Sequence, residues 1–203
     1  MLLANTTTLA GGPVYYILTC PEGAMERTVL LDYVPDDDMR SWSSGEAFGD
    51  EPHGFPEEAR PPEPVRFRVP KGRSGTLKAL YEAPAPVMKT TLADALRAAG
   101  VDNVQWFAAE IEWVGGERET DYEAFNVVGL IDAADRSRSD HDPDLNWFDT
   151  LILSEHQADW PLMFRLKGAP HHLMVHQQVR AHLEEAGFDM LQFTDPQQPR
   201  RGS

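Results

Sequence analysis

The chain has 203 residues, of which 41% are hydrophobic and 25% are charged, and its formal net charge is −15. Such proportions are those of a soluble globular protein, and they exclude a wholly disordered chain and a membrane-embedded one. Domains commonly hold about 100 to 200 residues, so we expect a single domain over residues 1–203. The acidic balance repels phosphate backbones, which argues against direct nucleic-acid binding and favours a basic protein partner.

We expect neither a targeting segment nor a membrane-spanning segment in this sequence. Its first residues, MLLANTTTLAGG, lack the basic start and the long apolar run of a secretory signal. No later run approaches the roughly 18 apolar residues that a spanning helix needs. We therefore expect a cytoplasmic protein without membrane contact. Cys20 is the only cysteine, so an intrachain disulfide and a cysteine zinc site are both excluded, and we expect no cofactor and no bound metal.

Two segments near the N-terminus, residues 13–20 and 27–34, are rich in β-branched and aromatic residues. The turn-like sequence PEGAME separates them, which predicts a pair of adjacent strands. Residues 65–69, VRFRV, alternate between apolar and basic side chains as a half-buried strand does. These segments predict a strand-rich N-terminal lobe over about residues 13–85.

Residues 35–64 interrupt this lobe with a segment that is thick with proline, glycine and acidic residues. Such a composition sustains neither a helix nor a central strand, so it predicts a long acidic surface loop. Loops of this length are uncommon in compact domains unless they bind something or are mobile. We expect Trp42, Phe48 and Phe55 to anchor parts of the loop to the body of the protein.

The C-terminal half contains two segments with the pattern helix, glycine, strand. In TTLADALRAAG, Thr91 is the expected N-cap and Gly100 the left-handed stop, and a strand is predicted over residues 104–114. In the tail, His176 is expected to begin a helix that ends at Gly187 and leads into a last strand. The two units resemble each other in spacing, although such units also recur without a common origin.

Short strands are expected between these units, at residues 149–154, 162–166 and 172–175. The predicted C-terminal lobe spans about residues 86–196 and contains both αβ units. Because helices are few and strands many and uneven, the expected class is α+β with a mixed, mostly antiparallel sheet.

Asp132 and Asp135 are the first candidates for chemistry, because paired carboxylates serve acid–base catalysis and metal binding. They lie where an apolar run gives way to serine and arginine, which favours instead a turn, a cap or an ion pair with a neighbouring arginine. A metal-dependent hydrolase would use both aspartates, together with His141 or His172. No nucleophile elbow or phosphate-cradling glycine loop is present, so the enzyme hypothesis has no further support.

Acidic residues are concentrated in two segments that we expect to be exposed. Acids interleaved with aromatic anchors are typical of an interface with a basic protein, although a merely solvated loop would have the same composition. The candidate contacts are Asp36, Asp37, Asp38, Trp42, Glu46, Asp50, Glu51, Asp140, Asp142 and Asp144.

Residues 122–139, YEAFNVVGLIDAADRSRS, together with a later FRL and the closing EEAGFDMLQF, resemble a family of bacterial toxin-immunity proteins. That family was first described from myxobacteria and was earlier catalogued as a domain of unknown function. The resemblance covers roughly the C-terminal half, and SWSSGEAFG extends it loosely into the N-terminal half. The matching positions are Tyr122, Asn126, Val127, Asp132, Ala133, Asp135, Ser139, Phe164, Arg165, Leu166, Gly187 and Phe193.

The resemblance implies an immunity protein that binds and neutralises a cognate toxin, often a nuclease, in self-protection or kin discrimination. It implies stoichiometric occlusion rather than catalysis, and Asp132 and Asp135 would then end a strand and fix the loop that follows. A metal-dependent hydrolase remains the alternative, and a scaffold that acts through self-association is a third possibility.

Overall fold

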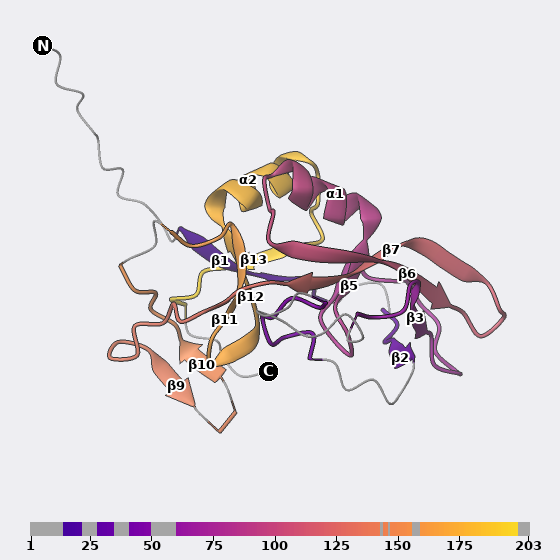
Figure 1. Cartoon of the computed structure of the whole chain (residues 1–203), viewed down its shortest axis with the longest axis horizontal. Helices are drawn as coiled ribbons and strands as arrows, with labels where there is room; N and C mark the ends of the chain where they lie inside the picture. The colour runs from indigo at the N-terminus through magenta and orange to yellow at the C-terminus, as the bar shows by residue number, and fades with distance from the viewer. Residues whose placement is uncertain are drawn as a thin grey trace, which may run out of the picture.

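A computed structural model describes residues 14–21, 28–34, 41–49, 60–142, 144–145, 147–155 and 159–198. Thirteen strands and two helices lie in that part of the chain (Figure 1). The strands are β1 (Tyr15–Thr19), β2 (Asp32–Val34), β3 (Val65–Arg68), β4 (Leu80–Tyr81), β5 (Val87–Lys89), β6 (Val104–Glu112), β7 (Arg118–Val127), β8 (Leu130–Ile131), β9 (Asp140–Asp142), β10 (Trp147–Thr150), β11 (Met163–Leu166), β12 (Ala169–His176) and β13 (Gln192–Thr194). The helices are α1 (Thr90–Ala98) and α2 (Gln177–Glu185).

The strands form two larger sheets and one hairpin. Six strands are ordered β2-β3-β6-β7-β5-β4, five are ordered β13-β1-β12-β11-β8, and β9 pairs with β10. The pairs β3–β6 and β8–β11 are parallel, and the other pairs of named strands in the described residues are antiparallel. The predicted class, α+β with mixed and mostly antiparallel sheets, is confirmed. The six-stranded sheet takes strands from both sides of residue 85, so the sheets do not divide the chain at the predicted lobe boundary.

The predicted pairing of residues 13–20 with residues 27–34 is wrong, because the two strands belong to different sheets. Strand β1 lies between β12 and β13, whereas β2 pairs with β3. Tyr15 and Ile17 face one core cluster and Leu18 the other, so β1 buries both faces as a central strand does. Composition indicated the strands correctly, but nearness in sequence did not determine their partners.

Other strand predictions agree with the structure in place but differ in length. Strand β3 coincides with the strand predicted at residues 65–69, β6 with that at 104–114, and β11 with that at 162–166. The segment expected at 172–175 is the inner part of the longer β12. The strand expected at 149–154 corresponds to β10, which begins earlier, at Trp147, and ends at Thr150.

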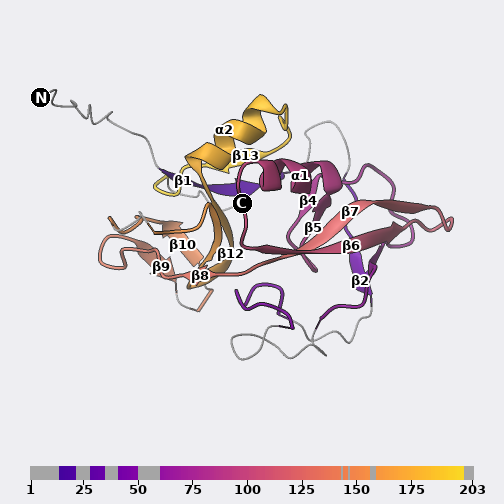
Figure 2. The ribbon, with the colours of Figure 1, turned by 45° about the horizontal axis from the view of Figure 1, so that its top comes forward.

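Both helices lie on the same side of the two sheets and cover a core that the sheets share (Figures 1 and 2). Leu96 of α1 and Leu183 of α2 meet Leu173 of the five-stranded sheet and Phe125 of the six-stranded sheet in one buried cluster. Each buried side chain of this size stabilises the fold by roughly 1.5 to 3 kcal/mol. In the described ranges, neither helix is long and apolar enough to cross a membrane.

The chain crosses from one sheet to the other directly after β7, through Val128 and Gly129. The Asn103 side chain holds this crossing, because its Nδ2 donates to the carbonyl oxygens of Val128 and Met163, both at 2.8 Å. The backbone amide of Val128 donates in return to the backbone carbonyl of Asn103 at 2.9 Å. The backbone amide of Arg165 donates to the backbone carbonyl of Gly129 at 3.2 Å. One asparagine therefore joins the end of β7 to β11 of the other sheet.

Helix α1 begins two residues before the position that the sequence predicted. Its N-cap is Lys89, which makes no side-chain capping bond, and Thr91 lies inside the helix. The difference arises because β5 runs directly into the helix, so Lys89 is still paired with Tyr122 in the sheet. Gly100, with φ of +94°, ends the helix as predicted.

Helix α2 begins as predicted at His176, which is its N-cap. The Nδ1 atom of His176 accepts a hydrogen bond from the Gln178 amide at 3.2 Å, so this nitrogen carries no proton in the capped state. Burial lowers the pKa of His176 below its ordinary value of 6.5. Gly187, with φ of +82°, follows the helix and leads towards β13.

We expect the free energy of unfolding to fall as pH decreases through and below 6.5, because the unfolded chain takes up the proton on His176 before the folded chain does. A His176→Asn variant keeps a capping acceptor and should lose this part of the pH dependence. A His176→Ala variant should lose it too, and should be less stable by about 1 kcal/mol at neutral pH. Urea denaturation at several pH values measures both effects, and equal pH slopes in wild type and His176→Asn would contradict the assignment.

Candidate functional site

Asp132 lies at the surface directly after β8 and forms two ion pairs. Its Oδ1 lies 3.3 Å from Nη2 of Arg136, and its Oδ2 lies 3.9 Å from Nζ of Lys167. All three side chains are about half exposed, so these pairs contribute little to stability. The carboxylate orients the loop that follows the strand.

Asp135 closes the turn that begins this loop. Its Oδ1 accepts hydrogen bonds from the Ser137 hydroxyl at 2.6 Å and from the Ser137 amide at 3.0 Å. These bonds lower the pKa of Asp135 below its usual range, and the bond from the Ser137 hydroxyl has the largest effect. The positive charge of Arg138, whose Nη1 lies 3.7 Å from Oδ2 of Asp135, lowers the pKa further. Both aspartates therefore have the turn and ion-pair roles that the sequence offered as the alternative to catalysis.

The histidines of the hydrolase hypothesis lie in aromatic surroundings. The His141 ring stacks on Phe148 at 4.4 Å, and His172 is buried with its ring 5.2 Å from that of Trp147. Within the described ranges, no group of three or more histidine, cysteine, aspartate or glutamate side chains is arranged to hold a metal ion. The residues named for hydrolysis do not form a common site there.

A second set of residues ties the segment 41–49 to the six-stranded sheet. Gln105 and Asn126 are opposite each other on β6 and β7. The Gln105 amide makes two bonds with the Phe48 backbone, accepting from its N–H at 2.8 Å and donating to its carbonyl at 3.0 Å. Asn126, which is fully buried, donates to the Glu46 carbonyl at 2.7 Å and to Gln105 at 3.0 Å. The side-chain amides of Gln105 and Asn126 thus hydrogen-bond to the backbone of this segment, as the backbone of a neighbouring strand would do.

Aromatic packing holds the same segment, as the sequence predicted for Trp42 and Phe48. Both rings are buried, and Trp42 meets Phe48 and Phe107 edge-on at 5.1 and 5.8 Å. Trp42 was also a candidate partner contact, but the structure places its ring in the core rather than on the open surface. Phe55 lies outside the described residues.

Gly45 brings the segment into backbone contact with the crossing between the sheets. Its carbonyl accepts a hydrogen bond from the Gly129 amide at 2.9 Å. Its φ is +77°, and a Cβ at this position would lie 2.7 Å from Cβ and 2.8 Å from the amide nitrogen of Leu130. Only glycine satisfies both the backbone conformation and this close approach.

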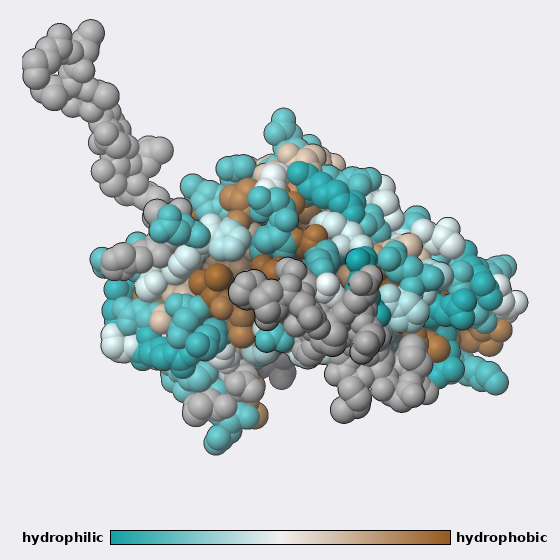
Figure 3. All heavy atoms as spheres, viewed as in Figure 1, coloured by the Kyte–Doolittle hydropathy of each residue, from teal (hydrophilic) through white to brown (hydrophobic). Residues whose placement is uncertain are grey.

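The acidic candidates that the structure describes lie in two places. Glu46 is exposed in the segment 41–49, and Asp140 and Asp144 are exposed in the β9–β10 hairpin, an end of the molecule that hydrophilic residues cover in Figure 3. Asp142 is half-buried and accepts from the amides of Asp144 and Leu145, so it shapes the turn. The other acidic candidates, Asp36, Asp37, Asp38, Asp50 and Glu51, lie outside the described residues.

A cavity of about 740 Å³ lies where these two acidic segments approach each other. Residues 41–43 form one part of its wall and Leu145, next to Asp144, forms another. Residues 82–84, Pro86 and Arg165 also line it. Its size is within the range of ligand-binding pockets, about 300 to 1,000 Å³.

Arg165 is a charged group that the sequence reasoning named only as a position of the family resemblance, without a role at a site. It lies on β11 with only 2% of its surface exposed, and its Nη1 donates to the Pro170 carbonyl at 2.8 Å. Its Nε and Nη2 have no hydrogen-bond partner among the residues that the structure describes. Burial lowers the pKa of Arg165, and the negative charge of Glu82 partly opposes this shift. The signal in the sequence was an arginine inside the apolar run LMFRL, which is unusual unless the charge has a partner.

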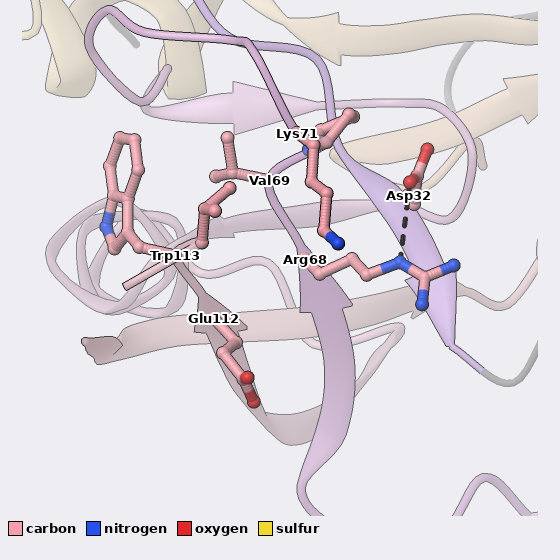
Figure 4. Close-up of a pocket in the computed structure, with 8 residues that line it drawn as sticks. Asp32, Arg68, Val69, Lys71, Glu112 and Trp113 are labelled. Atoms are coloured by element: carbon pink, nitrogen blue, oxygen red, sulfur yellow. Dashed lines mark hydrogen bonds and ion pairs between the residues drawn. The ribbon is translucent and has the colours of Figure 1, made fainter. Parts of the chain in front are cut away.

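A smaller cavity of about 380 Å³ lies at the ends of β2, β3 and β6 (Figure 4). Asp32 forms an ion pair with Arg68 at 3.4 Å, and Glu112 is 3.5 Å from Arg118. Figure 4 shows Glu112 pointing away from the Asp32–Arg68 pair, so the two carboxylates do not converge on one point. Since both carboxylates already have cationic partners, this cavity offers a weaker site than the one that contains Arg165.

Comparison with protein families gives one result that bears on all of these residues. Residues 15–198 match the model of a family described as an immunity protein family, Imm11. The family resemblance inferred from residues 122–139 is thereby confirmed, and it extends over both sheets. A comparison with curated proteins gave no match.

The close approach of Gly45 can be tested against Gly72, which has the same φ of +77° but no atom within 4 Å of the position that an added Cβ would take. We expect Gly72→Ala to cost about 1 kcal/mol for backbone conformation alone. Gly45→Ala should cost about 2 to 4 kcal/mol, because the added carbon also overpacks against the Leu130 backbone. Urea denaturation measures both values, and equal losses would show that the contact with Leu130 is not tight.

Proposed function

Since the chain belongs to the Imm11 immunity protein family, its role is that of an immunity protein, and we propose that it neutralises a basic nuclease toxin by stoichiometric occlusion. Membership of the family implies a cognate toxin as partner. The proposal adds the chemical nature of that toxin and the way in which it is blocked. It also places the encounter in the cytoplasm, in self-protection or kin discrimination.

The observation that carries the proposal is the charge of −15 on a chain from a toxin-binding family. Nucleases need basic surfaces because they bind phosphate backbones. An acidic inhibitor is attracted to such a surface from a distance, which raises the association rate. Once bound, its carboxylates occupy the positions that phosphates would take, so the toxin cannot engage its substrate.

We place the binding surface around the larger cavity, because both predicted acidic segments border it. The segment that contains Glu46 and the hairpin that contains Asp140 and Asp144 are about 95 residues apart in sequence and line the same hollow through residues 41–43 and Leu145. A surface with charge on both sides of a concave centre suits a protein partner, since exposed charge steers the encounter and the buried centre supplies most of the affinity.

No catalytic step is part of the proposal. The carboxylates of the hydrolase alternative, Asp132 and Asp135, are engaged in ion pairs and a turn. Binding of divalent metal to the purified protein, measured by elemental analysis, would revive that alternative. A scaffold that acts through self-association would be revealed by a solution mass that is a multiple of 22.7 kDa in the absence of any toxin.

The first experiment uses the full chain as bait in lysate of its source cell, at low and moderate salt, with mass spectrometry to identify bound proteins. We expect one basic protein in a one-to-one complex, and we expect its nuclease activity to disappear as the immunity protein is added to equivalence. A bound toxin that keeps its activity in the complex would contradict occlusion, and an inhibited toxin without nuclease activity would contradict the predicted target class.

Charge steering by the hairpin can be tested with one charge reversal and one matched control. Asp144→Lys should slow association with the toxin by about three- to tenfold at low salt and reduce the salt dependence of the rate. Glu117→Lys makes the same charge change at the exposed β6–β7 turn, at the other end of the molecule in Figure 1, and should have a much smaller effect. Stopped-flow kinetics at several salt concentrations gives both rates, and equal slowing would show that only net charge matters.

A further inference from the structure

Arg165 is buried without hydrogen-bond acceptors for all of its N–H groups in the described part of the chain. Its neighbours in β11, Phe164 and Leu166, are fully buried, and the arginine itself is only 2% exposed. Burial of a guanidinium away from water is unfavourable unless its N–H groups have hydrogen-bond acceptors. In the described part of the chain only Nη1 has one, the Pro170 carbonyl.

The two unsatisfied atoms, Nε and Nη2, belong to the same edge of the guanidinium group. Their N–H bonds are parallel, and this edge matches the two oxygens of a carboxylate in a bidentate arrangement. The edge belongs to a side chain that lines the larger cavity, and both of its nitrogen atoms are covered from solvent, so an acceptor reaches them only by displacing part of the cavity wall. The missing partner is therefore a planar group with two oxygens.

Trp42 also lines this cavity and carries a further buried donor. It lines the wall, it is only 6% exposed, and its indole Nε1 lacks a hydrogen-bond partner within the described ranges. Buried donors without acceptors are rare in folded proteins, and two side chains of this kind on one cavity favour an acceptor as the occupant. Pro84, Pro86 and Leu145 add apolar surface to the wall of the same cavity.

Glu82 sets a limit on the charge of the occupant. It is half-buried on the wall of the same cavity, and its negative charge acts on Arg165 through space. A carboxylate brings one negative charge beside Glu82, whereas a phosphate brings between one and two. The pair Arg165 and Glu82 thus tolerates a carboxylate better than a phosphate.

We propose that this cavity is a carboxylate-binding site, and that it receives an aspartate or glutamate side chain of the toxin on the Nε and Nη2 edge of Arg165. The inference rests on the proposed function for the identity of the occupant, but the chemistry of the site can be measured without the toxin. A single acidic residue on an otherwise basic toxin would pair with this deeply buried cation. The exposed acids would then set the rate of encounter, and Arg165 would set which toxin stays bound.

The site can first be probed with acetate, which is a free carboxylate. In the nitrogen–proton NMR spectrum of the ¹⁵N-labelled protein, Arg165→Lys identifies the Arg165 Nε–H signal by its loss. We expect that signal to shift saturably with sodium acetate, and far less with sodium chloride or phosphate at equal ionic strength. Glu82→Gln should lower the acetate concentration at half-saturation at least twofold. An Arg165 signal that ignores acetate in both wild type and Glu82→Gln would overturn the proposal, as would phosphate binding as tight as acetate.

The toxin complex tests the occupant. Arg165→Lys keeps the charge but loses the bidentate edge, and it should weaken the complex at least tenfold, mainly through faster dissociation. Arg180→Lys, on α2 beside Tyr16 and ion-paired to Glu184, is the control and should leave affinity unchanged. Circular dichroism verifies that both variants are folded.

The outcomes separate the two proposals. Tight binding that survives Arg165→Lys overturns the inference about the occupant while the immunity function stands. Conversely, acetate binding at Arg165 with no toxin recovered by wild type would leave the carboxylate site supported and count against the proposed target.

Discussion

The structure depends on how the chain is held where it passes from one sheet to the other. Val128 and Gly129 make this passage, and the Asn103 side chain fixes it by bonding to backbone on both sides. Gly45 then packs against it so closely that a single added carbon would collide with Leu130. Because β7 and β11 are set relative to each other here, the helices find one shared core, and the segment 41–49 reaches the larger cavity. An amide is suited to this role, since its two N–H groups donate to both carbonyls at once.

Polar groups buried beside the hydrophobic clusters divide into two kinds. Gln105 and Asn126 bond to each other and to the backbone of segment 41–49, so they specify a unique position for it. Asn126 leaves only its Oδ1 without a hydrogen-bond partner in the described ranges, whereas Arg165 leaves two of its three nitrogens without an acceptor. The first kind stabilises the fold and the second weakens it, which is the usual pattern when part of a site completes itself only with a partner.

Sequence reasoning was most successful where the signal is local. The alternation in VRFRV predicted β3, and His176 was recognised as a helix start because its side chain and its neighbours suffice to cap the helix. It failed where strand pairing depends on residues distant in sequence. The segments of β1 and β2 were predicted to pair with each other, yet each pairs with strands remote in sequence. At the candidate site, the turn role of Asp135 followed from adjacent serines, whereas the roles of Gln105 and Glu82 follow only from the packing of segments that the sequence does not show to be neighbours.

The larger cavity joins two kinds of structure that can change independently. Its cation is held by β11, a fully buried inner strand of the five-stranded sheet, where substitutions disturb the core. Its rim is built from the turn at 41–43, the connection at 82–86 and the tip of the β9–β10 hairpin, and such connections accept insertions and replacements with little loss of stability. Because Arg165 stays fixed on its strand while these connections can vary, one scaffold can acquire new binding partners through changes in its loops alone.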